Sequence, residues 1–276
     1  MKKNINTYLF IYLLILFLFS VFFLYQKHDV SNDSTISEWL INYEGGFTKR
    51  GLIGQLSIYI SEFLSLRLRD AILLFQALLV GTYFFLVYHF LKNIHYNKIF
   101  IFSIFTPIFI LYPVAEIEVL ARKEIFIFIY LLTYCFIPIK RKVYKFFYKL
   151  FLFPVAILIW EPVIFFILFF FFLDLIENKI KNINKLFFIN LAVYIPSIIL
   201  AAYIALNPIS DEAHKLMAAS LTENFNEKCY MSCDLLRSKS SIYQQFQGNF
   251  DKYSAEIFIR YILIVIIGFG PLFILL

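Results

Sequence analysis

Charged and glycine residues gather in one short run of an otherwise apolar chain, NYEGGFTKRGLIGQ at residues 42–55. Lys49 and Arg50 follow a glycine pair, and the pattern directly after them predicts a helix. Backbone N–H groups at a helix start, the positive end of its dipole and cationic side chains all favour phosphate. The run therefore predicts a phosphate-binding corner. The alternative is a loop whose basic residues contact lipid headgroups. Glu38 and Glu44 are alternative catalytic acids here.

Two further places carry charges at the edges of apolar runs. Arg122, Lys123 and Glu124 open one run, and Glu161 lies in IWEP between two others. Burial should raise the pKa of Glu161 unless a cation is near, which makes it a candidate general base or acid. In the alternative interpretation, the two basic residues are snorkelling lipid anchors, Glu124 is an ion-pair partner, and Glu161 caps a turn beside a structural cation.

Composition places the chain in a membrane. Hydrophobic residues make up 61% of its 276 residues and aromatic residues 21%, more apolar surface than a soluble domain of this length can hide. We expect an all-α, polytopic protein with one transmembrane domain over residues 1–276. The net charge of +6 comes without a basic, aromatic-rich patch in a polar segment, so no nucleic-acid partner is expected. Nucleotide-binding, zinc-protease and serine-hydrolase motifs are absent, and no metal or cofactor is predicted.

Apolar runs predict the spans, each of which needs roughly 17–25 residues. The candidates are Tyr8–Tyr25, Ala71–Leu91, Ile99–Tyr112, Ile125–Ile139, Leu186–Leu206 and Ile257–Leu276. The first is expected to be a retained span, since no small-residue cleavage site follows it. The last runs to the final residue, and we expect a C-terminally truncated version of a longer protein.

The segment 143–180 is either one long helix or a hairpin that turns at Trp160–Pro162. Proline suits the first position of a second helix, where its missing N–H has no cost. With the hairpin, the cytosolic segments hold twelve basic and two acidic residues, as the positive-inside rule expects; these segments are 1–7, 92–98, 140–149 and 174–185. We therefore predict the hairpin, eight spans and two cytosolic termini in the cytoplasmic membrane.

Two polar segments, 26–70 and 207–256, are expected to cover the outer face. Within the first, residues 51–70 predict an amphipathic helix at the membrane interface, with an irregular short span as the alternative. Its apolar face would hold Leu52, Leu56, Ile60, Phe63 and Leu64. In the second, Cys229 and Cys233 are either an extracytoplasmic disulfide or two neighbouring thiols. We interpret His214 as a solvated helix residue.

EGGFTKRGLIGQL after the first span, RKE at the start of a later one and IWEP in the middle resemble bacterial surface-polysaccharide repeat-unit polymerases, of O-antigen or capsule clusters. The chain is also distantly similar to C-type glycosyltransferases. The resemblance implies action on undecaprenyl-phosphate or -diphosphate sugars at the outer face of the membrane. It carries over Arg50, Arg122, Lys123 and Glu161. Lys49 stands where an arginine is expected, and Trp160 where a histidine is.

The sequence thus predicts glycosyl transfer onto a polyprenyl-linked glycan. Arg50 and Arg122, helped by Lys49 and Lys123, would hold the diphosphate of the lipid carrier, and Glu161 would accept a proton from the acceptor sugar. Other polysaccharide-assembly proteins are expected partners. Two alternatives stay open: a transporter or flippase of a lipid-linked or anionic solute that couples protons through Glu161, and a non-catalytic assembly subunit.

Overall fold

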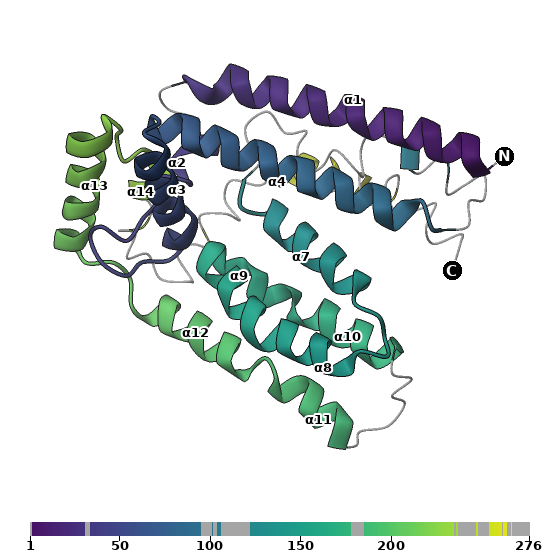
Figure 1. Cartoon of the computed structure of the whole chain (residues 1–276). Helices are drawn as coiled ribbons and strands as arrows, with labels where there is room; N and C mark the ends of the chain where they lie inside the picture. Colours follow the sequence, from purple (N-terminus) through teal and green to yellow (C-terminus); the bar gives the residue numbers. More distant parts are fainter. Residues whose placement is uncertain are drawn as a thin grey trace.

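The computed structural model describes residues 2–30, 34–94, 101, 104–105, 122–177, 185–234, 236, 247, 254–260, 262–263 and 266. Within these ranges every regular element is a helix, so the all-α prediction is confirmed for this part of the chain. Two long helices form one edge of the molecule, shorter helices pack beside them, and a helical cap lies at one end (Figure 1).

The two longest helices, α1 (Lys2–His28) and α4 (Leu68–Leu91), lie side by side (Figure 1). Leu13 of α1 and Phe84 of α4 are buried in one apolar cluster, to which α7 (Ile125–Phe136) also contributes. The other side of α1 exposes large apolar side chains, for example Phe22 at 55%. Such a surface is stable against lipid rather than water.

Three helical stretches are long and apolar enough to cross a membrane, Ile5–His28, Leu68–Leu91 and Phe187–Leu206. They coincide with three of the predicted spans and support a membrane protein. The third consists of α11 (Lys185–Ala192) and α12 (Ile195–Leu206), which meet at Tyr194. The predicted span 125–139 forms the shorter α7. Most of the predicted spans 99–112 and 257–276 lies outside the described residues.

The segment 142–177 is a hairpin, as predicted. One arm contains α8 (Lys142–Phe147), the π-helix η1 (Tyr148–Leu152) and α9 (Phe153–Ile159). Trp160 is extended, with φ −154° and ψ 100°, and the second arm begins as the 3₁₀-helix η2 (Glu161–Phe166) and continues as α10 (Ile167–Glu177). The turn is local: Trp160 is extended, and Pro162 two residues later has no backbone N–H with which to continue the first helix.

Contacts between the arms establish that they are antiparallel. Three facing pairs join them: Lys145 with Glu177, Lys149 with Asp174, and Phe153 with Phe170. In each pair the two residues are equally far from Glu161 in sequence, to within one position. Glu161 therefore lies at the tip, and the lysine–carboxylate pairs lie toward the opposite end.

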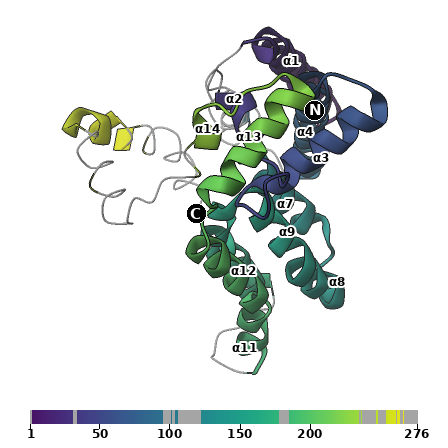
Figure 2. The same ribbon diagram turned by 90° about the vertical axis from the view of Figure 1, so that its left-hand side faces the viewer.

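The cap combines parts of both predicted polar segments. It contains α2 (Ser34–Ser37), the loop 38–50, α3 (Gly51–Leu64), α13 (Asp211–Phe225) and α14 (Met231–Asp234). Figure 2 looks onto this end and shows α13 crossing it. Arg69, at the start of α4, joins the two segments through a bidentate ion pair with Glu227.

Helix α3 packs through its small and polar face. Ser57, Ile58 and Ser61 are buried, whereas Leu56, Phe63 and Leu64 of the predicted apolar face are exposed, Phe63 at 88%. An outward apolar face fits a helix that lies on lipid. Gly54 permits the inward contact, because a Cβ there would come within 1.9 Å of the Ile41 carbonyl oxygen.

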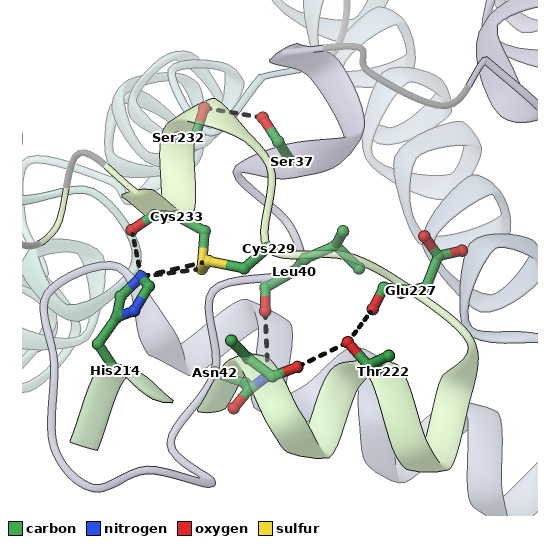
Figure 3. Close-up of a disulfide and its surroundings, with 10 residues drawn as sticks. Ser37, Leu40, Asn42, His214, Thr222, Glu227, Cys229, Ser232 and Cys233 are labelled. Carbon is green, nitrogen blue, oxygen red and sulfur yellow. Dashed lines mark hydrogen bonds between the residues drawn. A yellow bond between two sulfur atoms is a disulfide. The ribbon is translucent and has the colours of Figure 1, made fainter. Parts of the chain in front are cut away.

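A disulfide joins Cys229 and Cys233 beside α13 (Figure 3). Cys233 is fully buried in a small cluster with Ile41 and Met217. The bridge therefore stabilises the contact between the first loop and α13. Nearby, the Ser37 hydroxyl of α2 donates to the Ser232 hydroxyl of α14 at 2.8 Å (Figure 3).

Candidate functional site

Arg50 is held in an unusual conformation at the start of α3. It is the residue before the helix, with φ 61° and ψ 10°, a left-handed conformation that residues other than glycine rarely adopt. Its carbonyl oxygen accepts a hydrogen bond from the Lys123 ammonium at 2.5 Å. Strained backbone that tertiary contacts hold in place is concentrated at functional sites.

The Arg50 guanidinium forms a fork with Glu161 at the tip of the hairpin. Its Nε donates to one carboxylate oxygen of Glu161 at 2.7 Å and its Nη2 to the other at 2.9 Å. Its Nη1 donates to Glu38 at 3.2 Å. A planar guanidinium matches a carboxylate in this bidentate geometry and would match a phosphate equally well.

A second arginine, Arg122, lies three residues before α7 and also reaches the Glu38 carboxylate. Arg122 Nη2 donates to Glu38 Oε1 at 2.7 Å and lies 3.3 Å from Glu124 Oε1. One oxygen of Glu38 thus links both arginines. The side chain of Glu38 is only 3% exposed, compared with 23% for Arg50, 24% for Glu161 and 26% for Arg122. We call these four residues, with Lys123 and Glu124, the Arg50 cluster.

Burial and neighbouring charges set the pKa values of the Arg50 cluster. Lys123 is fully buried, and burial lowers its pKa to about 7, with the Arg50 charge acting in the same direction and the glutamates opposing it. Burial also raises the pKa of Glu124, against the influence of Arg122. For Glu161, burial would raise the pKa, but the Arg50 hydrogen bonds and charge outweigh it and lower the pKa.

The sequence predicted that burial would raise the pKa of Glu161 unless a cation is near. Arg50 is that cation, and the pKa of Glu161 is lowered. A carboxylate held this way is ionised but a weak base, because both of its oxygens already accept from Arg50. Proton acceptance by Glu161 therefore requires Arg50 to engage another anion.

Several buried polar atoms of the Arg50 cluster have no hydrogen-bond partner among the residues that the structure describes. They are Oε2 of Glu38, Oε2 of Glu124 and Nε of Arg122. Buried polar groups of this kind are rare, because each costs about 1–3 kcal/mol when unpaired. Two acceptors and one donor side by side suit a ligand that carries hydroxyl groups and an anion.

The predicted site residues fall into two groups. Arg50, Arg122, Lys123, Glu124 and Glu161 come together, from three segments distant in sequence. Lys49 is half-buried and helps to lower the pKa of Glu161. The Glu44 side chain is more exposed and accepts from Gln55 Nε2 at 2.8 Å instead.

Glu38 joins the two arginines, a role that the sequence did not indicate. The sequence suggested Glu38 only as an alternative catalytic acid, together with Glu44. The available signal was its position before Trp39, Leu40 and Ile41, which are all buried. A carboxylate next to such residues must be buried and paired, or shift its pKa.

The disulfide region is the one described place where side chains of metal-binding type converge. Ligand atoms of His214, Cys229 and Cys233 lie within 4.8 Å of one another. His214 is not the solvated residue expected, because it is 3% exposed and its Nε2 lies 3.3 Å from Cys229 Sγ (Figure 3). In the bridged state the two sulfurs bind each other, so their thiolates are not available to an ion.

Comparison with known proteins assigns no family. No family model matches the sequence, and searches of curated proteins and of solved structures each find no match.

Proposed function

We propose that the chain is a membrane-embedded glycosyltransferase or polymerase that acts on polyprenyl-diphosphate-linked glycan units for surface-polysaccharide assembly. The carrying observation is the Arg50 cluster, in which two arginines, a lysine and three glutamates from distant segments meet at the tip of an apolar hairpin. Charges next to a membrane core are costly and are typical of functional sites.

Exchange of anions on Arg50 would link substrate binding to catalysis. A diphosphate has the geometry to take the guanidinium fork that Glu161 occupies. Once Arg50 binds the diphosphate, Glu161 loses its two hydrogen bonds and burial raises its pKa. The carboxylate thereby becomes an effective base only when the lipid-linked substrate is bound.

The proposed transfer balances without a nucleotide sugar. The bond between the anomeric carbon and the diphosphate oxygen breaks, and a bond from that carbon to the acceptor oxygen forms. The acceptor proton goes to Glu161, and the polyprenyl diphosphate leaves as an anion stabilised by Arg50 and Arg122. Glu38 Oε2 and Glu124 Oε2 are available to accept sugar hydroxyls.

Location and partners form part of the same proposal. The cap and the Arg50 cluster would face the outside of the bacterial cytoplasmic membrane, with both termini in the cytosol. The substrate would enter from the bilayer, and other polysaccharide-assembly membrane proteins would act alongside it.

The test measures polymer formation in membranes that carry the lipid-linked repeat unit. Arg50→Lys should reduce polymer at least tenfold, because a point charge does not replace the fork. Arg67→Lys is the matched control, since Arg67 forms the same fork with Asp70 on the exposed surface. Glu161→Gln should abolish polymer while the repeat unit accumulates on the outer face, and exposed Glu212→Gln should not. Normal polymer from both site variants would leave a structural role for the cluster.

A transporter is the second candidate, because a buried Lys149–Asp174 pair lies between the same two arms that present Glu161. Ionisable pairs inside membrane helices are a feature of proton-coupled carriers. The Glu161→Gln variant separates the two functions. Under the transporter hypothesis, the repeat unit should accumulate on the cytosolic face instead of the outer face.

A further inference from the structure

A cavity of about 370 Å³ opens at the end of the hairpin opposite Glu161. Side chains of α8, η1, α10 and α11 line it. Lys149, which contributes to the wall, is 12 residues before Glu161, which corresponds to roughly 18 Å along a helix. The cavity is therefore separate from the Arg50 cluster and has the size of a small-ligand pocket.

The carboxylates in this cavity are already occupied. Asp174 accepts from the Tyr134 hydroxyl with one oxygen and from the Lys149 ammonium with the other. Glu177 accepts from the Lys145 ammonium. Asp174 and Lys149 are each 2–3% exposed, so the two acids pair with the lysines and hold them in the wall of the cavity.

Hydrogen-bond donors, in contrast, remain available. An ammonium has three N–H groups, so the bonds to carboxylates leave further donors on Lys145 and Lys149. The Asn190 Oδ1 lies 3.5 Å from the Lys149 ammonium, an orientation that a donor-only amine requires. This orientation leaves the buried Asn190 Nδ2 without a hydrogen-bond partner among the described residues.

Lys142 adds an unneutralised charge at the mouth of the cavity. It is exposed and forms no ion pair within the part of the chain that the structure describes. Beside it, Val143 and Phe147 are 65% and 48% exposed. The cavity thus presents donors and a net positive charge, and its rim is apolar.

We propose that this cavity binds the phosphate headgroup of an anionic phospholipid. A phosphate offers only acceptors and a negative charge, which complements Lys142, Lys145 and the Asn190 amide. The apolar rim at Val143 and Phe147 suits acyl chains, and basic pockets between membrane helices are known to take anionic lipid headgroups. The inference does not rest on the proposed glycosyl transfer.

Lipid titration of the purified full-length chain in a neutral detergent tests the proposal. Phosphatidylglycerol should bind at least tenfold more tightly than phosphatidylcholine, as measured by native mass spectrometry and by the rise of the thermal unfolding midpoint. Lys142→Gln and Asn190→Leu should each weaken phosphatidylglycerol binding at least fivefold. Lys215→Gln is the matched control, because Lys215 is an exposed lysine on α13.

Inorganic phosphate distinguishes the two sources of the headgroup chemistry. It should compete weakly with phosphatidylglycerol, since it lacks acyl chains. Binding of inorganic phosphate alone, with the same dependence on Lys142 and Asn190, would overturn the assignment to a lipid. Equal affinity for the two phospholipids, or unchanged binding by both site variants, would overturn the site itself.

Discussion

The hairpin carries a buried charge cluster at each end, and the two clusters differ in what they leave unpaired. Within the described part of the chain, Glu38 and Glu124 at the tip each keep a buried oxygen without a hydrogen-bond partner. At the other end, Asp174 accepts with both oxygens, whereas the Asn190 N–H₂ group finds no partner among the same residues. The first cluster thus leaves both acceptors and the Arg122 Nε donor unpaired among these residues, whereas the second leaves donors. We therefore expect the first to bind a ligand with hydroxyl groups as well as phosphate, and the second to bind a phosphate alone.

The two clusters also differ in how the chain builds them. Lys149 and Asp174 meet because they lie on facing arms of one hairpin, a local arrangement. The Arg50 cluster needs the first loop, the start of α7 and the hairpin tip to pack together, across up to 123 residues between Glu38 and Glu161. The stability of the Lys149–Asp174 pair should therefore depend on each residue keeping its partner. The geometry of the Arg50 cluster should depend on the packing of the backbone segments that carry it.

The largest effect is expected at the local pair. Lys149→Ala leaves the Asp174 charge buried and unpaired, which should lower the free energy of unfolding by about 3–5 kcal/mol. Lys149→Met combined with Asp174→Asn removes both charges and should cost clearly less. Arg50→Met should also cost less than Lys149→Ala, because the Arg50–Glu161 pair is about a quarter exposed. SDS titration in mixed micelles gives the measurement, and equal costs for Arg50→Met and Lys149→Ala would contradict the distinction.

Backbone packing at the Arg50 cluster can be disturbed through Gly54. The new Cβ of Gly54→Ala would lie 1.9 Å from a backbone oxygen of Ile41, so α3 must move, at a cost of about 3 kcal/mol. Gly81→Ala is the control, because its Cβ meets only the Phe17 ring, at 3.3 Å. Phosphatidylglycerol binding should survive in both variants, and its loss in Gly54→Ala would mean that the two ends are coupled.

The disulfide in the cap provides a test of which side of the membrane the cap faces. In unreduced membranes, a thiol reagent should modify only Cys135, which is free and exposed, and Cys229 and Cys233 should react after reduction. Their oxidation would indicate an extracytoplasmic cap. Loss of the bridge in Cys229→Ser should lower the free energy of unfolding by about 2 kcal/mol. Labelling of all three thiols before reduction would contradict this assignment.

Sequence reasoning succeeded where structure depends on neighbouring residues. An all-helical fold and a hairpin turning at Trp160–Pro162 follow from apolar runs, a proline and the distribution of lysines. Arg50, Arg122 and Glu161 were expected to act on one substrate. The link between the two arginines through Glu38 could not be predicted, because it depends on how distant segments pack.

At the end of the hairpin opposite Glu161, the sequence contained a signal for the Lys149–Asp174 pair that was not used. Lys149 and Asp174 were counted as charges of cytosolic loops, whereas the structure buries both. They lie 12 and 13 residues on either side of Glu161. In an antiparallel hairpin, residues at similar distances from the turn lie at a similar depth, so the predicted turn already placed these opposite charges at the same level of the two arms.

The smallest expected effect concerns Lys123, which distinguishes the Arg50 cluster by its pKa of about 7. The unfolded chain has the ordinary lysine pKa near 10.5, so between these values the unfolded state binds more protons than the folded state. Stability must then rise with pH in this window, by roughly 1 kcal/mol from pH 7 to pH 8, and change little below pH 6.

Lys123→Met isolates this contribution, because it removes the titrating group and keeps an apolar stem of similar length. The free energy of unfolding of the wild-type chain, measured at pH 6, 7, 8 and 9, should rise more steeply above pH 7 than that of Lys123→Met. The exposed Lys215→Gln variant should follow the wild-type curve. Parallel curves for wild type and Lys123→Met would mean that Lys123 stays charged in the folded chain. In that case the Arg50 cluster would carry three full positive charges, from Arg50, Arg122 and Lys123, against its three glutamates.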